Sequence, residues 1–286
     1  MAIQKVVVTG ASGFIGQAVV KTLVKDQSFD VVAVSRSKCS YVDCYQIENY
    51  RDTPGGDVLI HLAEQPDCGQ VNSLGDAYLE ESTSVLTTLL KKNYKKVIYA
   101  SSSVIYGDVG QEPFPESSFL AINNVYSKNK HANENLVLSR PNGIIVRLAN
   151  VIGLGMAANN VVSDILAQIP GVGSITVRNG VPVRDFICVS DVVDAILQLL
   201  KSSKSGVYNV GLGSGVSIAQ LASLCLKAVG ESHRQIESKA DTFQASYNVM
   251  NVQKIKNDIG WTANVTLEDC IKQIILNRNM KVDEML

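Results

Sequence analysis

Apolar runs and helical patterns alternate along the first half of the chain. The apolar runs are short and rich in β-branched residues, which is typical of strands buried on both faces of a sheet. Between them, apolar residues recur with the helical period of three to four. The expected strands are 5–9, 31–35, 58–62, 96–101 and 143–148, and the expected helices are 16–25, 78–92 and 125–139. This order predicts a doubly wound α/β fold with a parallel sheet covered by helices.

The pattern becomes less regular after residue 150, where a stretch rich in Gly, Ala and Asn at 151–160 is expected to be a loop. Further helices are expected at 161–168, 190–201, 217–229, 251–259 and 266–278, with strands at 175–177 and 207–210. Ser217 and Thr266 are good N-cap residues for two of these helices. We expect a doubly wound domain over 1–150, to whose sheet 189–212 returns, and a smaller α/β region formed by 151–188 and 213–286.

A glycine-rich turn follows the first expected strand, where Thr9 precedes Gly10, Gly13 and Gly16. Gly10 permits a tight turn, and Gly13 lets the backbone approach a pyrophosphate at the positive helix N-terminus. Gly16 allows close contact between helix and strand. Since the turn lies between a strand and a long helix, it predicts dinucleotide binding.

The end of the second expected strand bears on the choice of dinucleotide. An acid there would bind the ribose 2′-hydroxyl and repel a 2′-phosphate. This chain has Ser35, Arg36 and Lys38 instead. A hydroxyl with a guanidinium suits a phosphate, so NADP is the expected cofactor. NAD remains possible if Arg36 stacks on adenine or faces solvent.

Tyr126 and Lys130 lie four positions apart in an expected helix and share one face. They are candidates for catalysis because of their position after the expected strand that ends in the run Ser101 to Ser103, since the spacing alone is a weak signal. A tyrosine phenol, with a pKa of about 10, is a poor base at neutral pH. A neighbouring ammonium and a positively charged nicotinamide lower such a pKa. A hydroxyl from the run Ser101 to Ser103 would orient the substrate oxygen while hydride moves.

Together these motifs resemble the short-chain dehydrogenase/reductase superfamily, and in particular its extended branch, the NAD-dependent epimerase/dehydratase family. The segments 57–63, 147–153, 183–192 and 208–218 extend the resemblance over nearly the whole chain. The resemblance implies that Ser102 is the active serine, with Ser103 as the fallback and Ser101 as a structural residue. It also implies that Lys130 holds the nicotinamide ribose.

Two sets of ligand contacts follow from this resemblance and from the motifs above. The expected cofactor-binding residues are Gly10, Ser12, Gly13, Phe14, Ile15, Gly16, Ser35, Arg36, Lys38, Leu62, Ala63, Tyr126, Lys130, Ala149 and Val151. The expected substrate-binding residues are Ser102, Ser103, Asn150, Arg184 and Lys239. Asn150 and Arg184 are expected to reach the phosphates of a sugar nucleotide. Lys239 could replace a second phosphate-binding arginine that many relatives carry.

The residues after Ser102 reduce the number of reaction types to consider. Sugar-nucleotide dehydratases of the family carry an Asp-Glu pair there, whereas this chain has Ser103 and Val104. 4,6-Dehydration is therefore disfavoured, and reduction of a 4-keto sugar nucleotide by NADPH is the leading expectation. The alternatives are a 4-epimerase with retained NAD, a reductase of a non-sugar carbonyl, and a dinucleotide-binding regulator without turnover. The presence of Tyr126 and Lys130 argues against the last.

The net charge and the cysteine spacing argue against nucleic-acid binding, membrane binding and a metal site. The net charge is −1, and no basic cluster indicates nucleic acid or a membrane surface as a partner. The six cysteines form no CxxC pair and the histidines are scattered, so we expect no metal site and a reducing, cytoplasmic location. His61 is expected to be a packed core residue and Asp191 a helix cap. The resemblance also implies a homodimer formed through helices 78–92 and 125–139.

Overall fold

The computed structural model describes residues 3–239 and 245–283. At its centre lies a seven-stranded sheet in the order β10-β6-β5-β4-β1-β2-β3, in which all neighbouring strands are parallel. The strands are β1 (Gln4–Thr9), β2 (Phe29–Ser35), β3 (Tyr45–Gln46), β4 (Val58–His61), β5 (Lys96–Ser102), β6 (Gly143–Leu148) and β10 (Gly206–Val210). The expected doubly wound α/β fold is confirmed.

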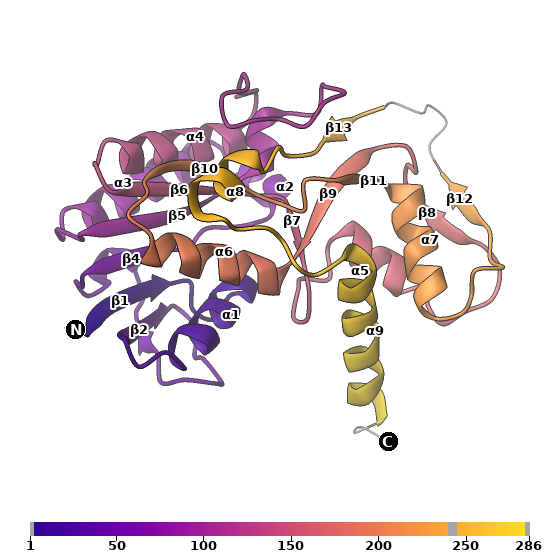
Figure 1. Cartoon of the computed structure of the whole chain (residues 1–286), viewed down its shortest axis with the longest axis horizontal. Helices are drawn as coiled ribbons and strands as arrows, with labels where there is room; N and C mark the ends of the chain where they lie inside the picture. Colours follow the sequence, from indigo (N-terminus) through magenta and orange to yellow (C-terminus); the bar gives the residue numbers. More distant parts are fainter. Residues whose placement is uncertain (1–2, 240–244, 284–286) are drawn as a thin grey trace.

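Helices cover both faces of this sheet (Figure 1). α1 (Phe14–Leu23) and α6 (Val189–Lys201) pack on one face, and α3 (Asp76–Leu90) and α4 (Val125–Leu138) pack on the other. Val6 and Val8 of β1 join the core under α1 and α6, whereas Val7 joins the core under α3 and α4. Because successive strand residues point to opposite faces and both faces are buried, the strand is apolar at every one of these positions.

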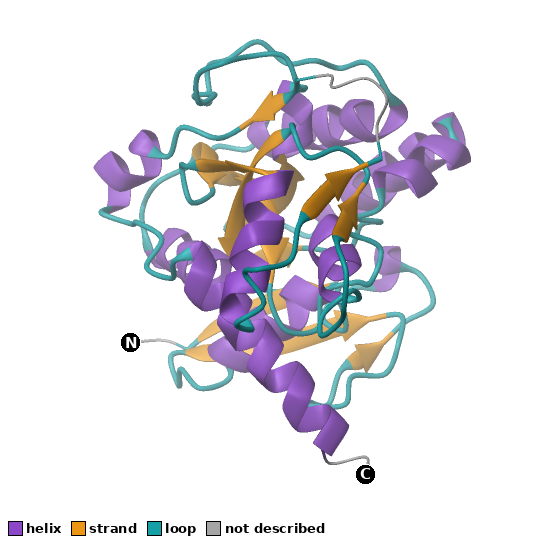
Figure 2. Cartoon of the chain, turned by 90° about the vertical axis from the view of Figure 1, so that its right-hand side faces the viewer, coloured by secondary structure: helices purple, strands orange, loops and turns teal. Residues whose placement is uncertain are grey.

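A smaller region with its own core lies beside the main sheet in Figure 1 and faces the viewer in Figure 2. Its mixed sheet has the order β11-β9-β13, with β7 also paired to β9, and a two-stranded sheet joins β12 to β8. The strands are β7 (Asn150–Ile152), β8 (Ile175–Val177), β9 (Val183–Cys188), β11 (Gly215–Ser217), β12 (Ile236–Ser238) and β13 (Tyr247–Asn248). The helices are α5 (Val161–Leu166), α7 (Ile218–Ala228) and α9 (Leu267–Asp283), while α8 (Gln253–Ile259) contacts β10 of the main sheet.

The differences from the sequence-based expectations concern one six-residue strand, one seven-residue helix and several shorter elements. The expected loop at 151–160 begins inside β7, and β9 and α2 (Cys68–Leu74) were not predicted as elements. α2 buries only Val71, so it shows no apolar period. Between β2 and β4 the chain forms β3 and one short 3₁₀ helix, η1 (Tyr50–Asp52), in place of a full crossover helix. No helix in the described ranges is long and apolar enough to cross a membrane.

The caps are confirmed for two helices and wrong for a third. Ser217 Oγ accepts a hydrogen bond from the amide of Gln220, and Thr266 Oγ1 accepts one from the amide of Asp269. Asp191 is not the N-cap of α6, because that position is held by Cys188. Its carboxylate instead accepts hydrogen bonds from the amides of Asn264 (3.1 Å) and Val265 (3.0 Å). Asp191 thus anchors the segment that leads into α9.

Candidate active site

The strand order reverses between β1 and β4, and ligands of such folds bind at the carboxyl ends of the strands where this happens. Gly10 follows β1, and Leu62 and Ala63 follow β4. A Cβ atom on Gly10 would lie 2.7 Å from the carbonyl oxygen of Leu62, so the two strand exits touch. The sequence motifs therefore meet at one crevice of the sheet.

The geometry of the glycine turn fits a dinucleotide. Gly10 has a φ of +74°, and a Cβ on Gly16 would lie 2.1 Å from the Gly10 carbonyl oxygen, so both positions require glycine. α1 begins after Gly13 with no side-chain cap. The first amides of a helix have no partner within the helix. The amides of Phe14 and Ile15 are thus free of a capping side chain and suited to a pyrophosphate.

At the end of β2, the two cationic side chains Arg36 and Lys38 face solvent. The Ser35 hydroxyl is buried, lies 2.6 Å from the Ser12 hydroxyl and accepts a hydrogen bond from the Ser37 amide. Arg36 and Lys38 are exposed. The Arg36 guanidinium lies 5.5 Å from the centre of the Tyr50 ring. Ser35 therefore stabilises the turn, whereas Arg36 and Lys38 are accessible to a ligand.

Tyr126 and Lys130 lie in the first turns of α4, which Asn124 caps through a reciprocal bond with Ser127. The Lys130 ammonium lies 5.7 Å from the centre of the Tyr126 ring. It also donates a hydrogen bond of 2.9 Å to the carbonyl of Ala100, two residues before Ser102. α4 thereby faces the end of β5.

Ser102 ends β5 and starts a short 3₁₀ helix, η2 (Ser103–Tyr106). Its hydroxyl accepts a 3.3 Å hydrogen bond from the amide of Val104, and the hydroxyl proton remains available to a substrate oxygen. Ser103 and Ser101 are buried, at 5% and 3% exposure. Ser102, which is only partly buried, is the best placed of the three hydroxyls for a ligand.

A buried carboxylate, Glu64, pairs with Lys130 and is absent from the sequence-based predictions. The Glu64 Oε2 and Lys130 Nζ atoms are 2.7 Å apart, and the two side chains are 7% and 8% exposed. The further hydrogen bonds that Glu64 accepts come from the Tyr99 hydroxyl, the Ser82 hydroxyl and the amides of Asn129 and Asn133. An acid directly after the apolar β4 was the one available signal, and it resembles the start of an exposed loop.

Both members of this pair are charged at neutral pH. Burial alone would raise the pKa of Glu64, but the Lys130 ammonium holds that pKa below its ordinary value. Burial alone would lower the pKa of Lys130, and the Glu64 carboxylate holds it above its ordinary value. Burial and the Glu64 charge raise the pKa of Tyr99 far above its ordinary value, so Tyr99 serves as a neutral donor.

His61, at the end of β4, is a packed residue. It is 2% exposed, and its Nδ1 atom lies 2.8 Å from the Thr9 hydroxyl. Burial lowers the pKa of His61 to about 4, so the ring is neutral at neutral pH. His61 therefore adds no charge beside Glu64 and Lys130.

The other expected substrate residues, Asn150, Arg184 and Lys239, lie in the smaller region. Asn150 and Arg184 are on the neighbouring strands β7 and β9, and the Asn150 amide donates to the Asp185 carbonyl at 2.9 Å. The Arg184 guanidinium donates to the Ser246 hydroxyl at 2.6 Å and pairs with Asp108 at 3.2 Å. The exposed Lys239 follows β12, in the separate two-stranded sheet. The structure thus groups Asn150 with Arg184 but not with Lys239.

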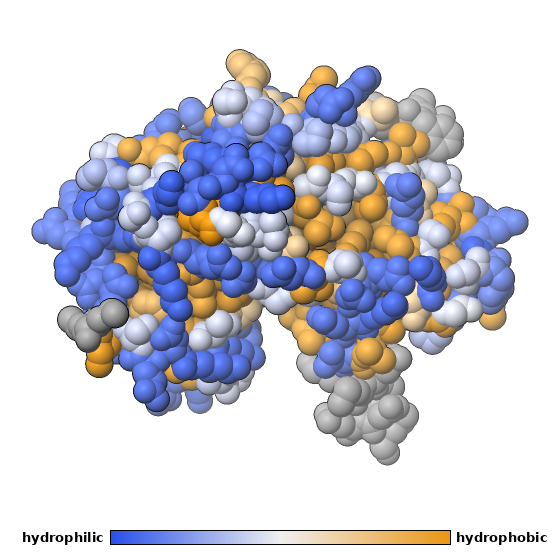
Figure 3. All heavy atoms as spheres, in the orientation of Figure 1, coloured by the Kyte–Doolittle hydropathy of each residue, from blue (hydrophilic) through white to orange (hydrophobic). Residues whose placement is uncertain are grey.

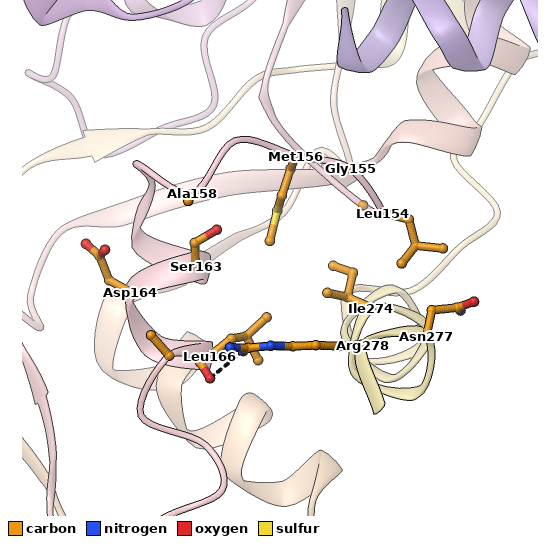
Figure 4. A pocket seen from close by; sticks show the side chains of 12 residues that line it. Leu154, Gly155, Met156, Ala158, Ser163, Asp164, Leu166, Ile274, Asn277 and Arg278 are labelled. Atoms are coloured by element: carbon orange, nitrogen blue, oxygen red, sulfur yellow. Dashed lines mark hydrogen bonds between the residues drawn. The ribbon is translucent and has the colours of Figure 1, made fainter. Parts of the chain in front are cut away.

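A cavity of about 640 Å³ lies in the smaller region. It lies between the loop after β7, α5 and α9, and Figure 4 shows Met156, Ile274 and Arg278 pointing toward it. A Cβ on Gly153, one of its lining residues, would lie 3.4 Å from the Phe14 ring. In Figure 3 the molecule is hollowed between the main sheet and the smaller region. Tyr126, Lys130 and Ser102 do not line this cavity.

The fold, the glycine turn and the Tyr126–Lys130 pair define a dinucleotide-dependent enzyme of the extended short-chain dehydrogenase/reductase class. The model of the NAD dependent epimerase/dehydratase family matches residues 6–211, and the chain belongs to this family. No group of three or more His, Cys, Asp or Glu side chains in the described part of the chain could hold a metal ion.

Individual relatives include enzymes of two reaction types. The chain is 29% identical to a putative UDP-arabinose 4-epimerase 2 of Arabidopsis thaliana, over 93% of this chain and 78% of that protein. It is 26% identical to the dTDP-D-glucose 4,6-dehydratase of Mus musculus, over 95% and 88% of the two chains. Among solved structures, MoeE5 in complex with UDP-glucose and NAD is 26% identical with a TM-score of 0.82, covering 97% of this chain and 99% of its own. UDP-glucose 4-epimerase of Thermotoga maritima has the same fold, with a TM-score of 0.83, 23% identity and coverage of 97% and 99%.

Proposed function

We propose that the protein is a nucleotide-sugar 4-epimerase that works with a retained NAD. The observation that carries this proposal is the Tyr126–Lys130 pair beside Ser102, with Val104 where a dehydratase would need an acid. Relatives named as 4-epimerases support it. The leading expectation from the sequence, a reductase of 4-keto sugar nucleotides, receives no specific support from these relatives.

A dinucleotide held along the turn from Gly10 to Gly16 would supply hydride transfer at carbon 4 of the sugar. Tyr126 would remove the proton from the C4 hydroxyl and return it afterwards. Ser102 would hold the same oxygen through its free hydroxyl proton, and Lys130 would donate to the nicotinamide ribose. The cofactor would follow the glycine turn and the exits of β4 and β6, with contacts at Ala63, Ala149 and Val151 among the residues predicted from the sequence.

Asn150 and Arg184 would bind the phosphates of the nucleotide. Their neighbouring strands bring them to one side of the site. Arg184 keeps 21% of its side chain exposed, and its bond to Asp108 would be exchanged for a bond to phosphate. Lys239 would reach the substrate only if the nucleotide extends toward β12.

A second candidate is an NADPH-dependent reductase, which one observation favours. Arg36 and Lys38 are exposed at the end of β2 with Ser35 in place of an acid, an arrangement that suits a 2′-phosphate. A homodimer formed through α3 and α4 belongs to either proposal, since these helices lie side by side on one face of the sheet.

The deciding experiment combines a cofactor assay with a substrate panel. The purified protein would be denatured and its released dinucleotide quantified, and UDP-sugars would then be incubated with it without added cofactor. Bound NAD(H) together with the C4 epimer in the product, detected by NMR, is the expected result. An empty protein that consumes 4-keto sugar nucleotides only with NADPH would replace the epimerase by the reductase.

A further inference from the structure

The Glu64–Lys130 pair can affect cofactor binding as well as stability, because the Glu64 carboxylate places a negative charge beside the proposed catalytic residues. An ammonium has three donor protons. Lys130 uses two of them on the Glu64 carboxylate and the Ala100 carbonyl. One proton therefore remains for a ligand, and the two fixed bonds determine where the ammonium lies.

The surroundings of Glu64 supply one opposing charge. In the part of the chain that the structure describes, the donors at its carboxylate other than Lys130 are neutral hydroxyl and amide groups. His61 and Tyr78 are near enough to interact with the carboxylate. His61 is neutral at neutral pH because burial lowers its pKa to about 4, and burial raises the pKa of Tyr78. The buried pair is therefore close to electroneutral as a whole.

We propose that Glu64 is a positioning residue that acts through Lys130, and that by cancelling the Lys130 charge it sets the preference of the site for oxidised over reduced dinucleotide. The inference rests on the proposed function, in which Lys130 lies at the nicotinamide ribose. The oxidised nicotinamide carries a positive charge and the reduced ring does not. An uncompensated ammonium would repel the oxidised form, and this repulsion is strong in a poorly hydrated site. The Glu64 carboxylate removes that repulsion, which suits an enzyme that starts each cycle with NAD⁺.

The test measures dinucleotide binding without substrate. Dissociation constants of NAD⁺ and NADH would be determined by calorimetry for the wild type, Glu64→Gln, Lys130→Met and the double variant. Glu64→Gln is expected to raise the ratio of the NAD⁺ constant to the NADH constant about ten-fold. Lys130→Met, which leaves the carboxylate unopposed, is expected to lower the ratio. The double variant restores neutrality and is expected to return within about three-fold of the wild type.

Tyr99→Phe is the matched control, because it removes a hydrogen bond to the same carboxylate but keeps both charges. Its ratio is expected to stay within about three-fold of the wild type, even if it lowers stability. A purely structural role of Glu64 would not move the two single variants in opposite directions. Circular dichroism would check folding. If a single variant does not fold, the double variant has no buried charge to leave unpaired, and a ratio ten-fold away from the wild type would overturn the proposal.

The two possible failures are distinguishable. If the wild type binds neither NAD⁺ nor NADH, the proposed function and the role of Glu64 both fall. If it binds both and the ratio does not respond to Glu64→Gln, or responds in the same direction to Lys130→Met, only the role of Glu64 is overturned.

Discussion

Arg147 of β6 and Glu134 of α4 form a buried ion pair, with 2.6 Å between Nη2 and Oε2 and side chains 5% and 2% exposed. A second guanidinium nitrogen donates to the Tyr106 hydroxyl at 2.9 Å. The Glu134 carboxylate raises the pKa of Arg147 beyond its ordinary value despite burial. This pair fixes α4, and with it Tyr126 and Lys130, to the central sheet.

Removing one partner of that pair should be costly. Glu134→Ala leaves the Arg147 charge buried without a counter-ion, and we expect a loss of about 3–5 kcal/mol in the free energy of unfolding. Chemical denaturation followed by circular dichroism measures it. Lys227→Ala is the control, since Lys227 is 62% exposed in its pair with Glu268 and should cost at most about 1 kcal/mol. An equal loss of unfolding free energy in the two variants would contradict the expectation that burial makes the Arg147–Glu134 pair the more costly one to break.

Tyr126→Phe should separate chemistry from binding. The variant lacks the group proposed to transfer the proton, so the turnover number is expected to fall about 10²–10⁴-fold, while the dissociation constant for NADH stays within about three-fold. Turnover assays and calorimetry would measure the two effects. Tyr94→Phe provides the comparison, because Tyr94 precedes β5, at the end opposite Ser102, and its hydroxyl donates to the Pro54 carbonyl. Turnover retained by Tyr126→Phe would exclude Tyr126 as the proton-transfer group.

Arg36→Ala tests whether Arg36 makes the protein discriminate between NADPH and NADH. If Arg36 leaves the Tyr50 ring to contact a 2′-phosphate, the variant loses about ten-fold or more in NADPH affinity with little change for NADH, as expected for a charge-assisted hydrogen bond. Fluorescence titration with both cofactors measures this change. Lys25→Ala, an exposed cation past the end of α1, should leave both affinities unchanged. Parallel losses for both cofactors would mean that Arg36 supports binding without reading the phosphate.

Asp185 should make stability depend on pH. Burial raises its pKa to about 6, although the amides of Leu212, Gly213 and Met250 donate to it. The folded state thus binds this proton more tightly than the unfolded state, and the stability that the protonated group contributes is lost as pH rises from about 4 to above 6. The free energy of unfolding of the wild type minus that of Asp185→Asn is expected to fall by about 2–3 kcal/mol between pH 4 and pH 7. Urea denaturation at both pH values would measure it, and a difference that rises with pH would show that the three amides dominate.

The long strands and helices of the main sheet could be predicted from the sequence, because burial on both faces makes the apolar runs continuous. The glycine turn was predictable for a local reason, since Gly10 has a positive φ and Gly16 lies against the Gly10 carbonyl six residues earlier. Tyr126 and Lys130 could be paired because a helix fixes their spacing. The strands of two or three residues show no period that a sequence pattern could reveal.

Glu64 could not be predicted, because its partners come from distant segments. Tyr99 is 35 residues away in the sequence, and Lys130 is 66 residues away. The surroundings of Arg184 could be predicted only in part, for a similar reason. Its bonds to Ser246 and Asp108 connect residues 62 and 76 positions away, so the sequence could identify a phosphate-binding residue type but not the bonds it already makes.

The strand order has a consequence for how the molecule can move. β7, β8 and β9 come before β10 in the sequence, yet β10 pairs with β6 at the edge of the main sheet. The chain therefore crosses between the main sheet and the smaller region several times rather than through a single linker. Near these crossings, the Asp191 carboxylate also joins α6 to the segment before α9 through the amides of Asn264 and Val265. A wide opening between the two regions would disturb several backbone crossings together, so we expect ligand access to use small sliding displacements and local loop movements.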